Sequence, residues 1–180
     1  MNCFVWRVPY ATDRFTNSTS KFEFIRNELL GKKILRQGWG IEDLRKGESS
    51  YVKEWIRIGW VDSAAAKKRF NILKPMLDIK FGDFIVIPRL SLRNNQNTSG
   101  KYFTIVFCTK DYNFSFPPSI PDKDFGNFIE VDWSEENFTY DYDKLSPNKS
   151  LKYISDHLSS YSKAINRVLD TNFTKAVLKL

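Results

Sequence analysis

Residues 79–88 read Ile-Lys-Phe-Gly-Asp-Phe-Ile-Val-Ile-Pro and carry the clearest strand signal in the chain. The pair Gly82-Asp83 is typical of a turn, and Asp83 is interpreted as a turn former and not as an acid catalyst. The residues from Phe84 to Ile87 are all branched or aromatic, which predicts a buried strand. Pro88 ends this strand because proline has no backbone N–H to donate.

Helical and extended patterns alternate on either side of this strand. Apolar and aromatic runs predict further strands over residues 4–8, 32–39, 102–109 and 127–133. Helical spacing predicts helices over residues 21–30, 51–58, 64–74 and 149–169. The last helix is long and amphipathic, with an apolar stripe formed by Leu151, Ile154, Leu158, Tyr161, Ile165 and Val168.

This order of elements predicts an α+β fold. Its sheet is expected to be mostly antiparallel and strongly curved, a pattern that suits a small β-barrel flanked by helices, with a C-terminal helix. Residues 1–148 are predicted to form the barrel domain. Residues 149–180 are predicted to form a helix that packs on the barrel or leads to an effector domain.

Composition points to an anionic partner. The 180 residues contain 28 Lys and Arg against 21 Asp and Glu, a net charge of +7, and an excess of this size favours a polyanion. The chain also has 15 Phe, 8 Tyr and 5 Trp, which is enough to leave some rings for stacking on a ligand. Cys3 and Cys108 lie in apolar runs and are interpreted as buried small hydrophobic residues.

Signals for catalysis, metals and membranes are weak. The sequence has no Gly-rich phosphate loop, no Gly-x-Ser-x-Gly and no His-Glu-x-x-His, and His157 is its one histidine. We therefore expect no enzyme activity, no metal and no cofactor. Arg7 interrupts the first apolar stretch, and no run approaches the roughly 20 apolar residues of a membrane span, so the expected location is the cytoplasm.

Three segments together carry a family resemblance. They are Gly38-Trp39-Gly40 followed by Asp43-Leu44; Phe70 followed by residues 79–88; and Asp111-Tyr112 leading to Val131-Asp132-Trp133. In this order they resemble the N-terminal domains of Mrr- and McrB-type modification-dependent restriction systems, which are similar to EVE, YTH and other PUA-like folds. The resemblance covers roughly residues 4–135, and the loop at residues 91–100 is longer than in many relatives.

The resemblance implies a PUA-like (EVE/YTH-like) curved barrel that captures a base, often a methylated base flipped out of a duplex, in an aromatic pocket. It also implies an effector GTPase or nuclease, as a further domain or a subunit. Trp39 is the best pocket candidate by similarity to the YTH-type cage, because Gly38 and Gly40 would leave its indole open to a base; a buried hinge tryptophan is the alternative. The full set of base-pocket candidates is Tyr10, Trp39, Tyr112, Asn113, Phe114 and Trp133.

The other pocket candidates each have a structural alternative. Tyr112, Asn113 and Phe114 are expected in a loop that follows a strand, where rings can stack and Asn113 can read a base edge. The alternative is that the two rings cover the open end of the barrel. Trp133 shares a strand face with Val131, which favours a core position.

Basic residues bracket these candidates in sequence, which makes them candidates for phosphate contacts. Solvated surface charge is the alternative reading of such runs. The phosphate-binding candidates are Lys32, Lys33, Arg36, Arg45, Lys67, Lys68, Arg69, Arg89, Arg93 and Lys101.

The leading hypothesis is a DNA-binding specificity domain of a modification-dependent restriction system. Alternatives are an RNA-binding PUA-like module and a protein-interaction domain that uses the terminal helix. A fourth hypothesis is a nuclease, because Pro75 with Asp78-Ile79-Lys80 is similar to the carboxylate–lysine core of metal-dependent nucleases. That site would need further acids on adjoining strands to hold a metal.

Overall fold

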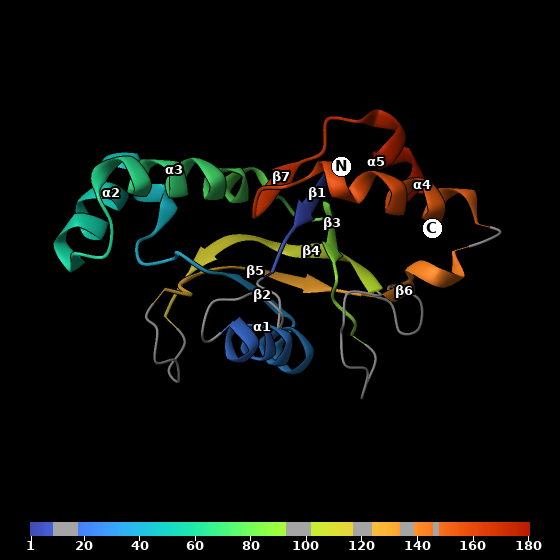
Figure 1. Ribbon diagram of the computed structural model, residues 1–180, viewed down its shortest axis with the longest axis horizontal. Helices are drawn as coiled ribbons and strands as arrows, with labels where there is room; N and C mark the ends of the chain where they lie inside the picture. Colours follow the sequence, from blue (N-terminus) through green and yellow to red (C-terminus); the bar gives the residue numbers. More distant parts are fainter. Residues whose placement is uncertain (9–17, 93–101, 117–123, 134–138, 146–147) are drawn as a thin grey trace.

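The computed structural model describes residues 1–8, 18–92, 102–116, 124–133, 139–145 and 148–180. These residues form a seven-stranded mixed sheet and five α-helices, so the α+β prediction is confirmed (Figure 1). The strands are β1 (Cys3–Trp6), β2 (Ile34–Gln37), β3 (Phe84–Pro88), β4 (Tyr102–Phe114), β5 (Asn127–Asp132), β6 (Thr139–Asp141) and β7 (Ile165–Arg167).

The sheet is open in the described part of the chain. Its strand order is β2-β5-β4-β3-β1-β7, with β6 paired to β4 beside this path. The β1–β3 pair is parallel, and the other strand pairs are antiparallel. Because β2 and β7 stand at opposite ends of the order, the sheet does not close into the predicted barrel.

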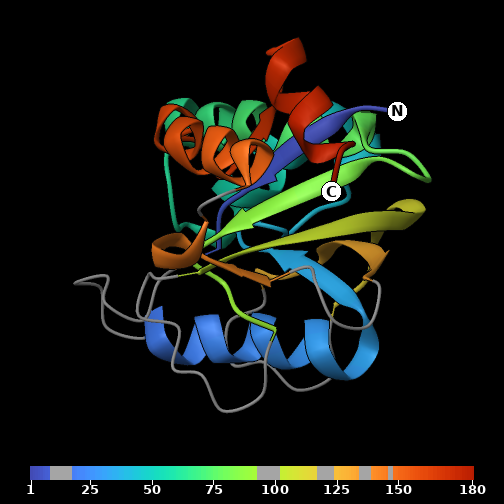
Figure 2. The same cartoon turned by 90° about the vertical axis from the view of Figure 1, so that its right-hand side faces the viewer.

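Helices cover the sheet from two sides. Helix α1 (Ser18–Lys32) lies along one face, and the other helices lie on the opposite side (Figures 1 and 2). On that side α2 (Gly47–Ile58) and α3 (Ser63–Leu73) form one lobe, while α4 (Lys149–His157) and α5 (Thr171–Val177) form another (Figure 1). The described residues also form four 3₁₀ turns: η1 (Leu44–Lys46), η2 (Lys74–Asp78), η3 (Tyr142–Lys144) and η4 (Leu158–Ser160).

The turn at residues 80–83 positions β3 as predicted. The Asp83 carboxylate accepts the backbone N–H of Asn2 at 2.6 Å and that of Lys80 at 3.0 Å, and Gly82 has φ 82°. Asp83 is therefore a turn former that also connects the start of β1 to this turn. Cys3 and Cys108 are buried free thiols, as expected.

The C-terminal helix prediction was wrong. Helix α4 ends at His157, and Ile165–Arg167 is instead the strand β7, paired antiparallel with β1. Ile165 and Val168 fit the apolar stripe of a helix, but both are buried by pairing against β1, where the Val168 N–H donates to the Cys3 carbonyl at 2.9 Å. A long-range strand pair thus outweighs the local helical pattern.

The loop predicted after residue 109 is also strand. Strand β4 runs on to Phe114 and pairs with β5 as far as Asn127, through two register shifts between Cys108 and Asn113. In the described residues, no helix is long and apolar enough to cross a bilayer.

Candidate nucleic-acid interface

Trp39 lies two residues after the end of β2 and contacts residues of both α2 and α3. Its φ is 66°, a left-handed value that is uncommon outside glycine. Its N–H donates to the Asp124 carboxylate at 3.3 Å, and its carbonyl accepts the Tyr51 hydroxyl at 2.7 Å. The indole packs against the core and stays partly exposed.

The role of the glycines beside Trp39 differs from the predicted one, which was to leave the indole open to a base. A Cβ on Gly40 would lie 2.5 Å from the backbone nitrogen of Asn127, because the two chain segments touch. The Gly40 N–H donates to the Asp124 carbonyl at 2.5 Å, and the Gly126 N–H donates to the Gly40 carbonyl at 2.8 Å. Gly40 therefore allows close backbone approach and does not open space around the indole. A Cβ on Gly38 would make ordinary contact with Phe125, at 3.6 Å.

Arg69 covers the Trp39 ring. Its guanidinium carbon lies 5.4 Å from the centroid of the Trp39 ring and 4.4 Å from that of Trp55, within reach of cation–π attraction to both. Trp55 is buried, whereas Trp39 and Arg69 are partly exposed. Arg69 was predicted to bind phosphate, and here its guanidinium makes cation–π contacts with Trp39 after β2 and Trp55 of α2.

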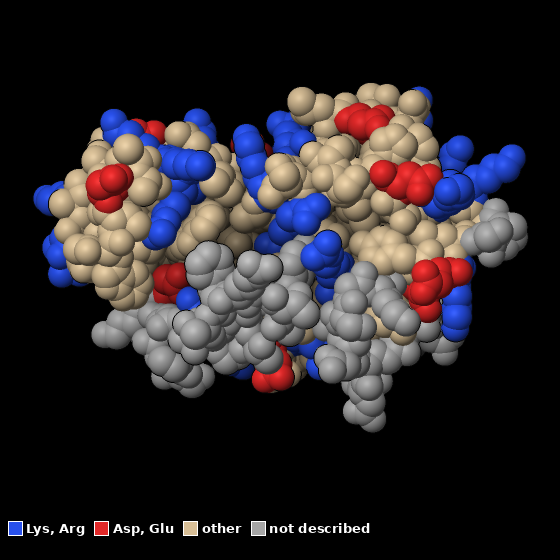
Figure 3. Space-filling model, in the orientation of Figure 1, with Lys and Arg blue, Asp and Glu red and all other residues tan. Residues whose placement is uncertain are grey.

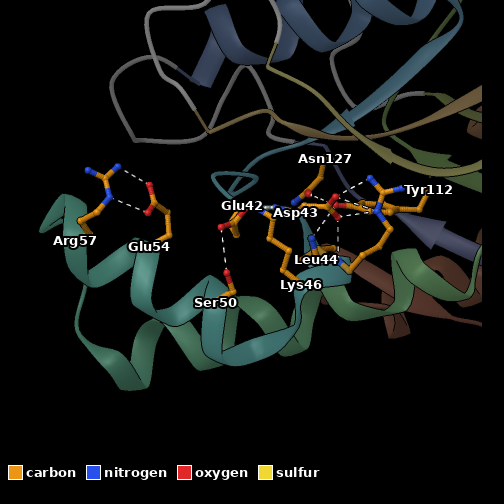
Figure 4. A network of polar contacts seen from close by, with 10 residues as sticks. Glu42, Asp43, Leu44, Lys46, Ser50, Glu54, Arg57, Tyr112 and Asn127 are labelled. Atoms are coloured by element: carbon orange, nitrogen blue, oxygen red, sulfur yellow. Dashed lines mark hydrogen bonds and ion pairs between the residues drawn. The ribbon is translucent and has the colours of Figure 1, made fainter.

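Tyr112 does not line a pocket, contrary to prediction. Tyr112 is 6% exposed. Its hydroxyl donates a hydrogen bond to Asn127 Oδ1 at 2.7 Å, and the Tyr112 hydroxyl oxygen also accepts one from the Leu44 N–H at 3.0 Å (Figure 4). Burial raises the pKa of this phenol. Tyr112 therefore joins η1 to β5 inside the fold, and its ring is not available for a base.

The neighbours of Tyr112 serve the sheet as well. The ring of Phe114 is within 2.5 Å of where a Cβ on Gly126 would lie, and it packs edge-on against Phe116 at 5.2 Å. Asn113 is exposed, and its side-chain oxygen accepts the Phe114 N–H at 2.8 Å. Phe114 is partly buried against the core and covers this end of the sheet, which was the alternative reading.

Trp133 and Tyr10 do not join Trp39 in one site. Trp133 follows the C-terminal end of β5, whereas Trp39 lies near its first residue, Asn127; six extended residues separate these ends by about 20 Å. Lys33 lies over the Trp133 ring at 5.3 Å, and the indole packs partly buried against the core. Tyr10 lies outside the described residues.

Four of the predicted phosphate ligands, here called the first basic cluster, flank β2 in sequence, and carboxylates of the same chain neutralise them; they are Lys32, Lys33, Arg36 and Arg45. Glu28 binds both Lys32, at 2.6 Å, and Arg36, at 2.9 Å. Arg36 is 4% exposed and also donates to the carbonyls of Ser115 and Phe125, so its assignment as a phosphate ligand was wrong.

Two further candidates of that cluster are exposed but also have acidic partners. Lys33 pairs with Asp132 at 2.5 Å, and Arg45 pairs with Asp43 at 2.6 Å. A phosphate would have to compete with these carboxylates for either cation.

The second basic cluster consists of the candidates on α3, Lys67, Lys68 and Arg69, and its lysines have no carboxylate partner among the described residues. Lys67 and Lys68 are exposed on α3, and neither has an ion pair with a carboxylate among the described residues. Lys53 on α2 and Lys74 at the end of α3 are also exposed and have no ion pair with a carboxylate among the described residues, and the sequence analysis did not name them as phosphate ligands. Lys and Arg side chains gather over this α2–α3 lobe and across the middle of the face shown in Figure 3.

Helical spacing would have separated most of these lysines. Lys32 has an acid four residues before it, as does Lys46 with Glu42, and both form that pair. Lys53, Lys67 and Lys68 have no acid three or four residues away in either direction. Lys74 is the exception, because Asp78 lies four residues after it and the two form no ion pair among the described residues. Arg89 is exposed just after β3, with φ 59°; Arg93 and Lys101 lie outside the described residues.

The residues of the nuclease hypothesis lie in η2 and just after it. Asp78 is exposed at the end of η2, and Lys80 pairs with Asp111 at 3.0 Å. In the part of the chain that the structure describes, no group of three or more His, Cys, Asp or Glu residues could hold a metal ion.

Comparison of the chain with protein-family models and with curated proteins found no match to either. Function is therefore inferred from the geometry described above.

Proposed function

We propose that this protein is a nucleic-acid-recognition module that binds duplex DNA and receives a modified base at Trp39, with the α2–α3 lobe on the phosphates. In this proposal it is a PUA-like specificity domain of a modification-dependent restriction system, and its partner is a GTPase or nuclease effector. The observation that carries the proposal is the position of Trp39: a partly exposed indole in a left-handed conformation, next to a lobe whose lysines have no acidic partner.

The backbone of Trp39 supports a functional role. A non-glycine residue in this region costs on the order of 1–3 kcal/mol and persists only where the surroundings impose it. Here Asp124 and Tyr51 hold the N–H and the carbonyl of Trp39. The conformation fixes the indole at the sheet end, where a base could reach its exposed part.

Energetics require more than this one ring. Extruding a base costs a few kcal/mol, and stacking on one aromatic side chain returns roughly 1–3 kcal/mol. Because Tyr112 is in the core, phosphate contacts from Lys67, Lys68 and Lys74 must supply much of the remainder. A methyl group adds only about 0.8 kcal/mol of apolar contact, so selectivity for it needs a shaped site.

The test is a binding series on three matched ligands: a duplex with a methylated base, the same duplex unmethylated, and RNA of the same sequence. Trp39→Ala should weaken binding of the methylated duplex roughly ten- to hundredfold. Its binding of the unmethylated duplex should fall much less, because phosphates supply most non-specific affinity. Trp133→Ala, which removes a partly buried indole at the far end of β5, is the matched control and should change neither.

A second variant, which is not expected to affect the fold, tests the phosphate contacts. Lys67→Ala with Lys68→Ala should weaken all duplexes about equally while leaving the melting temperature unchanged. Equal affinity of the wild-type protein for methylated and unmethylated DNA would contradict modified-base recognition. A clear preference for the RNA would assign the module to RNA.

A further inference from the structure

A surface groove lies between α2 and α3, outside the Trp39 site. Its volume is about 390 Å³, within the range of small-ligand sites. It is lined by Glu48, Ser49, Val52, Lys53 and Ile56 of α2 and by Lys67 of α3.

The lining combines an apolar surface with positive charge. Val52 is almost buried, whereas Ile56 on the same helix is 53% exposed. Lys53 and Lys67 contribute two cations that have no ion-pair partner among the described residues, against the single carboxylate of Glu48. The groove is therefore suited to a ligand that has both an apolar body and negative charge.

An exposed tryptophan follows the same helix. Trp60 is 55% exposed and comes just after Gly59, the left-handed residue that ends α2. Its ring packs on Trp55, with centroids 5.8 Å apart, and Trp55 is buried between Trp60, Tyr51 and Arg69. Trp60 is thus supported from behind while about half of its surface faces solvent, which is unusual for a residue type that is mostly buried.

We propose that the groove and Trp60 form a binding site for single-stranded nucleic acid, in which Trp60 stacks on an unpaired base and Lys53 and Lys67 contact the phosphates. Aromatic platforms beside a cationic groove are the physical basis of single-strand binding that tolerates any sequence. The choice of a nucleic acid as the polyanion rests on the proposed function, but this site needs neither a duplex nor a modified base.

Charge complementarity favours this ligand. A phosphate next to Lys53 and Lys67 gains two cations that have no carboxylate partner among the described residues, so none of those carboxylates must be displaced. Glu48 repels the same phosphate, so Glu48→Gln should tighten binding of a single strand. An acidic peptide would satisfy the lysines but would not need the flat face of Trp60.

The experiment measures binding of a ten-nucleotide deoxythymidine oligomer to the full chain by fluorescence anisotropy at low salt. Trp60→Ala should lower the affinity roughly ten- to hundredfold. Phe81→Ala is the matched control, since Phe81 is 77% exposed on the turn before β3, next to the paired Lys80, and should bind as the wild type. Lys67→Ala should reduce the slope of log affinity against log salt by about 0.7, whereas Lys80→Ala should not.

Two results would overturn the single-strand site: Trp60→Ala binding the oligomer like the wild type, or Trp60→Ala and Phe81→Ala losing affinity equally. A third is binding of a ten-residue oligoglutamate that depends on Lys53 and Lys67, without any binding of the oligomer, which would assign the groove to a protein. Binding of the methylated duplex, and its dependence on Trp39, is measured in a separate experiment with a different ligand. Either proposal can therefore fail while the other stands.

Discussion

Among the described residues, three non-glycine residues have left-handed backbones: Lys33, Trp39 and Arg89. Lys33 lies between α1 and the start of β2, Trp39 lies two residues after β2, and Arg89 follows β3. Strained conformations of this kind cluster at ligand sites and switch regions. Under the proposed function, Trp39 is the one of the three that has an aromatic ring to stack on a base.

Tyr112 was predicted to line a pocket, but two hydrogen bonds of its hydroxyl hold it in the core. Tyr112→Phe should leave the Leu44 N–H and Asn127 Oδ1 without that partner, at a cost of about 1–3 kcal/mol. Urea unfolding should show this as a lower midpoint with an unchanged slope. Tyr140→Phe is the control, because the Tyr140 hydroxyl makes no hydrogen bond within the described residues, and its stability should stay close to that of the wild type.

Helix α1 is anchored to the sheet by a buried ion pair between Glu28 and Arg36 of β2. Burial acts to raise the pKa of the Glu28 carboxyl, but hydrogen bonds from Lys32 and Arg36 outweigh it and hold that pKa below its ordinary 4.5. A lowered pKa contributes stability at pH values above 4.5, and this contribution disappears as the pH falls through the folded-state pKa.

Arg36→Met should therefore destabilise the protein at pH 7, by about 3–5 kcal/mol, because it leaves the buried Glu28 carboxylate without its buried partner, with only the exposed Lys32 to pair with it. The difference from wild type should shrink as the pH falls below 4.5 and through the lowered folded-state pKa of Glu28, where its carboxylate becomes protonated. Denaturant unfolding at pH 7 and pH 3.5 measures both effects. Lys110→Met breaks an exposed pair with Glu130 and should cost less than about 1 kcal/mol; an equal loss from both variants would refute the special role of Arg36.

The C-terminal elements complete the sheet. Strand β7 pairs with β1, and α4 and α5 bury a second apolar cluster against β1, β3 and β4; its C-terminal members are Leu151, Ile154, Leu158, Val168, Phe173, Ala176 and Val177. Burial of each large apolar side chain is worth about 1.5–3 kcal/mol. Their sum is on the order of the whole stability of a domain.

Removing residues 149–180 should therefore leave the chain largely unfolded at 25 °C, as seen by circular dichroism and thermal melting. Removing only residues 178–180, where Leu178 and Leu180 are 50% and 44% exposed, should change the melting temperature much less. A shortened chain that melts like the wild type would show that these elements dock on the sheet without supporting it.

The whole molecule carries +7, but internal ion pairs decide how much of this charge can reach a phosphate backbone. If all ten basic candidates bound phosphates, the slope of log affinity against log salt would be about −9. The four lysines of the α2–α3 lobe without acidic partners predict a slope of about −4. Duplex titrations between low and physiological salt distinguish these values, and a flat response would remove the electrostatic part of the proposal.

Local sequence was enough to predict the turn at Asp83, the strand after it and the helices α1, α2 and α3, because caps, turn pairs and apolar periodicity act within a few residues. It was also enough to predict an α+β fold. The open sheet, the β7–β1 pair, the burial of Tyr112 and Arg36 and the stacking of Arg69 on Trp39 were decided by contacts between residues far apart in the chain. Hydrophobic pattern and charge are properties of segments, whereas the partner that buries a ring or neutralises a cation is selected only when distant segments pack together.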